Sequence, residues 1–161
     1  MAAFLEILRN NEEVVAVVIG VFLAFLLEWI STARKRRGHF SALQAEMELC
    51  RALAETYLQH KISAPLYRLP TMAYAHSLPE LLGSAALGKK ETKALLEFFT
   101  EVETLNRGLD QAQAVRDDAK KLKEEVERNE IKAGHLVPNQ SYYHQARSIL
   151  DGRLRWYRWF W

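Results

Sequence analysis

The chain has 161 residues, of which 22 are Lys or Arg and 20 are Asp or Glu, so its formal net charge is only +2. This balance argues against a dedicated nucleic-acid-binding protein, whose surface should be strongly basic. The hydrophobic share of 49% is too high for a disordered chain, and one cysteine allows neither an internal disulfide nor a multi-cysteine metal site. Seven glycines and four prolines are few for this length, which favours an all-α fold.

The most apolar part of the chain lies near its N-terminus. Fourteen consecutive positions, VVAVVIGVFLAFLL at 14–27, carry no polar side chain, and Glu28, Trp29 and the basic run RKRR follow. As a helix, residues 14–32 would span about 28 Å, close to the hydrocarbon thickness of a bilayer. A signal peptide would need a basic start and a small-residue cleavage site, and a buried core helix would lack the tryptophan and basic edge. The pattern predicts one transmembrane helix within residues 13–37.

Charge differs between the two flanks of this segment. The C-terminal flank carries Arg34, Lys35, Arg36 and Arg37, whereas the N-terminal flank is mainly acidic. Because basic flanks stay on the cytoplasmic side, we expect a single-pass topology with residues 38–161 in the cytoplasm. Residues 1–12 would lie outside, where the helical spacing of their apolar residues predicts a short amphipathic segment along the membrane interface.

Small residues recur at every fourth position of the predicted span: Ala16, Gly20 and Ala24, followed by Glu28. They share one helix face, and small side chains let a second helix approach closely within lipid. This face is the predicted helix-packing surface. Glu28 has two interpretations: a functional carboxylate buried against a neighbour, or a residue near the boundary that reaches water and pairs with the basic residues that follow.

Residues 38–161 are predicted to form a small helical bundle. Apolar residues from Phe40 to Leu58 follow a three- and four-residue spacing, and we expect this helix to continue from the transmembrane segment and to end before Pro65. Residues 66–88 hold two prolines and two glycines and are predicted to form a connector with a two-turn helix, TMAYAHSL.

One long helix is expected over residues 91–130, about 60 Å at the standard rise. Its apolar residues are spaced close to a heptad, but its second half, RDDAKKLKEEVERNE, is mostly charged and typical of an exposed helix or coiled-coil arm. Residues 134–139, GHLVPN, interrupt the chain, and a last helix is predicted from about residue 140.

The last nine residues, RLRWYRWFW, interleave arginines with aromatic rings. Beside a transmembrane helix this composition predicts an interfacial anchor, with indole rings at headgroup level and guanidinium groups on anionic lipid. Stacking on single-stranded nucleic acid and packing into a neighbouring subunit are the alternatives. The predicted membrane-interface residues are Trp29, Arg34, Lys35, Arg36, Arg37, Arg155, Trp156, Arg158, Trp159 and Trp161.

The sequence offers no motif for catalysis. It lacks a phosphate-binding glycine loop, an HExxH motif, a Cys/His cluster and a nucleophile elbow, and its five histidines are scattered. We therefore predict no catalytic residue, no metal ligand, no cofactor and no enzymatic activity.

Three stretches carry a family resemblance: VVAVVIGVFLAFLLEWI with its basic cluster, RLPTMAY at 68–74 and VETLNRGL at 102–109. They are similar to a group of uncharacterised bacterial single-pass inner-membrane proteins, which have a valine-rich span followed by a cytoplasmic helical region. The resemblance covers about residues 14–110 and leaves out the aromatic C-terminus. It implies a location in the bacterial inner (cytoplasmic) membrane and no activity.

Two functional hypotheses follow. In the first, the protein is a non-catalytic accessory or scaffold subunit of a larger inner-membrane complex and docks through its transmembrane helix. Its partners would be membrane protein subunits, in a hetero-complex rather than a homo-oligomer, and anionic lipid, with no nucleic acid. In the second, a self-associating membrane-tethered module recruits a soluble cytoplasmic protein through the charged residues 116–130.

Overall fold

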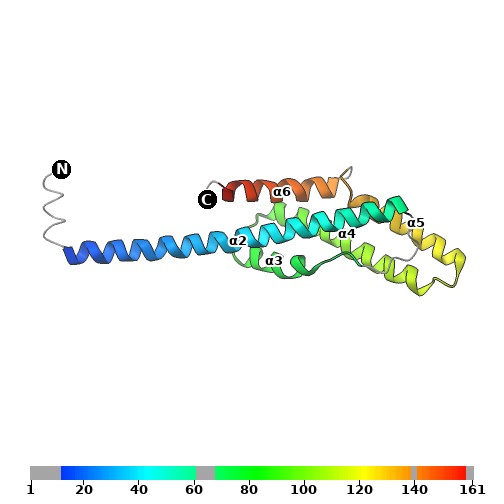
Figure 1. Cartoon of the computed structure of the whole chain (residues 1–161), viewed down its shortest axis with the longest axis horizontal. Coiled ribbons are helices and arrows are strands. Elements are labelled where there is room, and N and C mark those ends of the chain that lie inside the picture. The colour runs from blue at the N-terminus through cyan, green and yellow to red at the C-terminus, as the bar shows by residue number, and fades with distance from the viewer. Residues whose placement is uncertain (1–11, 61–67, 139–140, 159–161) are drawn as a thin grey trace. The chain divides into compact units, whose positions relative to one another are not determined.

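The computed structural model describes residues 12–60, 68–138 and 141–158 (Figure 1). Within these ranges the chain forms five helices and no strand, which confirms the all-α prediction. They are α2 (Glu12–His60), α3 (Met72–Gly83), α4 (Lys89–Ala114), α5 (Ala119–His135) and α6 (Ser141–Arg158). The amphipathic segment expected at residues 1–12 lies outside the described residues, except that Glu12 begins α2.

The chain divides into two compact units, Met1–Arg36 and Arg37–Trp161. The first unit holds the apolar beginning of α2, and the second holds the remainder of α2 with α3 to α6. As expected, a single helix continues from the apolar segment through Gly38 to residue 60. Glycine within a helix costs about 1 kcal/mol relative to alanine, which one position in a helix of 49 residues tolerates.

The second unit has a continuous core because its three longest helical stretches each bury one stripe. Along each stripe the buried residues lie three, four or seven positions apart, a spacing that keeps side chains on one helix face. Burying a large apolar side chain fully contributes roughly 1.5–3 kcal/mol. The buried residues, each at most 7% exposed, are Phe40, Leu43, Met47, Cys50, Ala54 and Tyr57 on α2, Leu95, Phe98, Val102, Leu105, Leu109 and Ala112 on α4, and Tyr143, Ala146, Leu150 and Tyr157 on α6.

Helix α6 lies antiparallel to the second-unit part of α2. Gln44 Nε2 donates a hydrogen bond to Asp151 Oδ1 at 2.6 Å, and the Phe40 ring lies 6.0 Å from the Tyr157 ring. The later residue on α6 thus meets the earlier residue on α2. This direction brings the C-terminal end of α6 to the beginning of the second unit.

Helix α3 begins where a carboxylate from α2 caps it. Glu46, only 7% exposed, accepts the backbone N–H groups of Ala73 and Tyr74, each at 2.7 Å. The first N–H groups of a helix have no partner within the helix, and a carboxylate there also favours the helix dipole. The helix therefore starts at Met72 and runs past the expected two turns to Gly83.

The predicted long helix over residues 91–130 is wrong, because residues 115–118 separate α4 from α5. The Asp118 carboxylate accepts the Lys121 N–H at 3.2 Å, an N-cap that starts a new helix inside the charged stretch. Helix α5 then folds back along α4 and buries Ala133 (Figure 1). Most of the charged stretch therefore belongs to α5, the second helix of a helical hairpin, and does not extend α4 as one long arm.

Candidate membrane and partner interface

In the first unit, the large apolar side chains at the beginning of α2 are exposed. Val17, Phe22, Phe25 and Leu27 are 65–71% exposed. An 18-residue window of this helix has a mean hydropathy of 2.5, and none of it is buried. Soluble monomers rarely expose continuous apolar patches larger than a few hundred Å². Among the described helices, α2 alone is long and apolar enough to cross a membrane.

The strip of small residues lies open on the same helix. Ala16, Gly20, Ala24 and Glu28 are all exposed. A Cβ added at Gly20 would meet no atom within 4 Å. No contact in the described chain therefore requires a small residue at Gly20. The packing role of this strip, and both interpretations of Glu28, stay predictions.

The predicted membrane-interface residues fall into two groups. Side chains are described for Trp29, Arg34, Lys35, Arg36, Arg37, Arg155 and Trp156, whereas the side chain of Arg158 and all of Trp159 and Trp161 lie outside the described part. Trp29 is 49% and Trp156 50% exposed. Both side chains are thus about half exposed at the surface of their own unit.

The second unit brings the end of α6 beside the first turns of its α2 segment. Arg37 of α2 and Arg155 of α6 line the same groove, which has a volume of about 460 Å³. Sequence reasoning named both arginines but did not place them together. It missed the other four lining residues, which are Ser41, Gln44, Asp151 and Leu154.

The carboxylates beside this groove are already matched by donors. Asp151 accepts hydrogen bonds from Gln44 at 2.6 Å and from Arg147 Nε at 2.9 Å. Arg147 also pairs with Glu48, whose Oε1 accepts the Tyr143 hydroxyl at 2.9 Å. This network joins α2 to α6 and gives both carboxylates hydrogen-bond donors.

Arg153, another member of the arginine and aromatic tail, packs α6 onto α4. Its Nε donates to Glu91 Oε1 at 2.8 Å, and its Nη2 donates to Glu91 Oε2. Glu91 also accepts the Gly88 N–H at 2.7 Å at the start of α4. The hydrogen bonds from Arg153 hold the pKa of Glu91 below its usual value. Arg153 thus has a structural partner inside the second unit.

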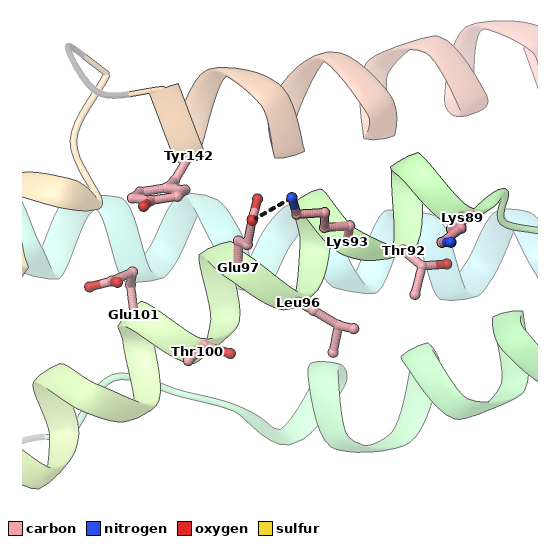
Figure 2. Close-up of a pocket in the computed structure, with 8 residues that line it drawn as sticks. All are labelled: Lys89, Thr92, Lys93, Leu96, Glu97, Thr100, Glu101 and Tyr142. Carbon is pink, nitrogen blue, oxygen red and sulfur yellow. Dashed lines mark ion pairs between the residues drawn. The ribbon is translucent and has the colours of Figure 1, made fainter.

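A second groove, of about 560 Å³, follows the outer face of α4 (Figure 2). Three of its charged residues lie in ion pairs: Lys93 Nζ lies 3.5 Å from Glu97 Oε1, and Glu101 Oε2 lies 3.2 Å from His135 Nδ1. Figure 2 shows the Tyr142 ring reaching over it from α6. The arrangement offers charged and apolar contacts to a ligand or partner.

Histidine and cysteine do not gather into a metal centre in the described ranges, where no group of three or more His, Cys, Asp or Glu side chains could hold a metal ion. His39 Nδ1 lies 3.2 Å from Ser77 Oγ, and the His39 and His76 rings lie 5.8 Å apart. Burial, with a smaller effect from the charge of Glu46, raises the pKa of Cys50 to about 12, which keeps its thiol protonated.

No family model matches this chain, and comparison with curated proteins and with solved structures found no match. Its function is therefore inferred from the surfaces that the two units present.

Proposed function

We propose that this protein is a non-catalytic accessory or scaffold subunit of a larger bacterial inner-membrane complex, into which it docks through a transmembrane helix. The observation that carries the proposal is the apolar beginning of α2, where large side chains such as Phe25 are up to 71% exposed. Lipid covers such a surface without requiring polar partners, because every backbone group of a helix is satisfied internally.

The strip at Ala16, Gly20, Ala24 and Glu28 is the proposed docking face. Helices gain little from apolar burial when they associate in lipid, so they depend on close packing through small residues and on polar contacts. An ionisable residue within a span usually faces protein or water. Both features of the strip therefore favour a neighbouring transmembrane helix.

The proposed topology places the N-terminus outside and the second unit in the cytoplasm. The basic run at 34–37 supports it, because basic flanks are retained on the cytoplasmic side. The second unit has its own buried core and joins its helices through ion pairs such as Glu91 with Arg153. Such a unit suits the scaffold role, in which a rigid domain holds other subunits near the membrane.

The test replaces Gly20 or Ala24 with isoleucine and measures partner recovery after extraction from native membranes in mild detergent. We expect mass spectrometry to find a stoichiometric set of membrane proteins with the wild-type chain. Gly20→Ile and Ala24→Ile should weaken recovery by roughly 1–2 kcal/mol or more, a factor of about five to thirty. The Gly20 site has room for a side chain in the isolated protein, so the loss would report on a neighbour.

Matched controls place the same side chain on the opposite face of the helix. Val18→Ile and Phe22→Ile keep that face apolar, and both sites are more than 60% exposed. They should leave partner recovery unchanged. Equal recovery from all four variants would remove the strip as the docking face.

The alternative function is a membrane-tethered module that recruits a soluble protein through α5. It is favoured by the many charged side chains that α5 exposes, namely Lys120, Lys121, Lys123, Glu124, Glu127 and Arg128. Deleting residues 1–36 separates the two functions, because a partner held in the membrane is lost and a partner held by α5 is retained.

A further inference from the structure

The groove between α2 and α6 combines neutral donors with two arginines that have no carboxylate partner among the described residues. Neither Arg37 nor Arg155 pairs with a carboxylate in the ranges that the structure describes, unlike Arg147 and Arg153 on the same helix. Ser41 adds a hydroxyl group, and the groove measures about 460 Å³. The groove is therefore large enough for a small anion and holds donors from two helices.

The single carboxylate in the groove already has donors. Asp151 accepts from Gln44 at 2.6 Å and from Arg147 at 2.9 Å, and Arg147 is shared with Glu48. Arg37 and Arg155 together outnumber this one carboxylate. Two guanidinium groups remain for an incoming anion. Planar guanidinium groups bind phosphate oxygens through paired, charge-assisted hydrogen bonds, which makes a phosphate group the best chemical match.

The source of that phosphate follows from where Arg37 stands in the sequence. If residues 14–32 fill the hydrocarbon core, the five further residues to Arg37 add about 7 Å at the helical rise, comparable with one headgroup layer. Trp156, next to Arg155, is 50% exposed, and exposed tryptophans favour the headgroup level. A lipid phosphate would meet the groove at this depth.

We propose that the groove lined by Arg37, Ser41 and Arg155 binds the phosphate group of an anionic phospholipid. The inference rests on the proposed membrane span but not on the docking strip. The sequence predicted that the arginine and aromatic residues at the end of α6 contact the membrane surface in general. The proposal instead gives this end of α6 a defined binding site for one lipid molecule.

The experiment uses the full chain, purified in detergent and stripped of lipid, with native mass spectrometry as the readout. Phosphatidylglycerol is added, and phosphatidylcholine serves as the zwitterionic comparison. We expect the wild-type chain to retain phosphatidylglycerol preferentially. The double variant Arg37→Gln/Arg155→Gln should bind it at least about tenfold more weakly, because each lost guanidinium removes charge-assisted hydrogen bonds.

The matched control, Arg107→Gln/Arg116→Gln, removes the same charge at residues that do not line this groove. These side chains are 78% and 69% exposed, so folding should tolerate their loss. Equal lipid retention by both double variants overturns the proposal. Circular dichroism of each variant confirms that its helices remain.

A second arm adds inorganic phosphate in place of lipid. Binding of free phosphate that matches phosphatidylglycerol in affinity, and that Arg37→Gln/Arg155→Gln abolishes, would overturn the lipid assignment in favour of a soluble phosphate compound. Partner recovery is measured in parallel. Gly20→Ile should lose partners and keep lipid, whereas the groove variant should lose lipid and keep partners, so the two proposals fail separately.

Discussion

Gly20 and Gly108 both lie inside helices, but their surroundings differ. A Cβ on Gly108 would lie 1.8 Å from Asn129 Oδ1, because α5 crosses α4 closely at that point. A Cβ on Gly20 would meet no atom within 4 Å. The chain itself explains why residue 108 is small. Among the described residues no such contact explains a small residue at position 20, so a packing role for Gly20 stays a prediction.

The same contrast holds for the aromatic residues of the two units. Phe40, Phe98 and Phe99 in the second unit are fully buried, whereas Phe22 and Phe25 in the first are 65% and 71% exposed. The second unit thus forms an apolar core of its own. The described part of the first unit leaves its large apolar side chains exposed.

The largest expected effect comes from separating the two units. A chain of residues 37–161 keeps the whole buried core, so we expect it to fold in aqueous buffer with a helical spectrum and a cooperative thermal transition. The full chain should require detergent, because its apolar segment is exposed. Membrane fractionation and circular dichroism measure both properties. Unfolding of the fragment, or a full chain that stays in solution without detergent, would contradict the comparison.

The glycine contrast predicts an intermediate effect. Gly108→Ala should destabilise the second unit by about 1–2 kcal/mol, since the overlap of the new methyl group with Asn129 outweighs the roughly 1 kcal/mol that alanine gains over glycine within a helix. Gly20→Ala should leave its thermal unfolding unchanged. Asn129 is fully buried, and its side-chain atoms have no hydrogen-bond partner among the described residues, so Asn129→Ala can remove the clash. Gly108→Ala should lower the free energy of unfolding less when Asn129 is already alanine than in the wild-type chain. If the double variant is destabilised by the sum of the two single effects, a clash between residues 108 and 129 is ruled out.

The smallest expected effect is the pH dependence of the pair between Glu91 and Arg153. The lowered pKa of Glu91 in the folded state means that the pair stabilises the fold above about pH 4.5 and loses this contribution as pH falls through the folded pKa. Arg153→Gln should reduce stability at neutral pH by at most about 1 kcal/mol, because both side chains are partly solvated. Thermal unfolding from pH 7 to pH 3 measures the difference. Between pH 7 and pH 3, Arg153→Gln should lose less stability than the wild-type protein. The control Arg107→Gln should lose as much stability as wild type.

Local patterns were sufficient for most of the helices but not for the contacts between them. The apolar run, the core spacing from Phe40 and the last helix near residue 140 follow from periodicity and breakers. The break at residues 115–118 was missed because it contains no glycine or proline and depends on one capping aspartate, Asp118. A capping residue inside a charged helical stretch is the signal that would have revealed it.

Long-range polar contacts explain the remaining differences. Glu46 caps α3 from another helix. The Asn106 side chain accepts the Leu69 backbone N–H at 2.8 Å and donates to the Leu69 carbonyl oxygen at 2.9 Å. No local spacing encodes such pairs. The groove was missed for the same reason, although Arg37 and Ser41 stand one helical turn apart beside the core stripe.

Site-specific photocrosslinking in native membranes tests the docking face most directly. A photoreactive phenylalanine analogue is placed at Leu27, an already large residue one turn from Ala24 on the same side of the helix, and, separately, at Phe22 on the opposite face. We predict a discrete crosslink from position 27 to another membrane protein and crosslinks mainly to lipid from position 22. Lipid adducts alone from position 27, or the same protein adduct from both positions, would contradict the account.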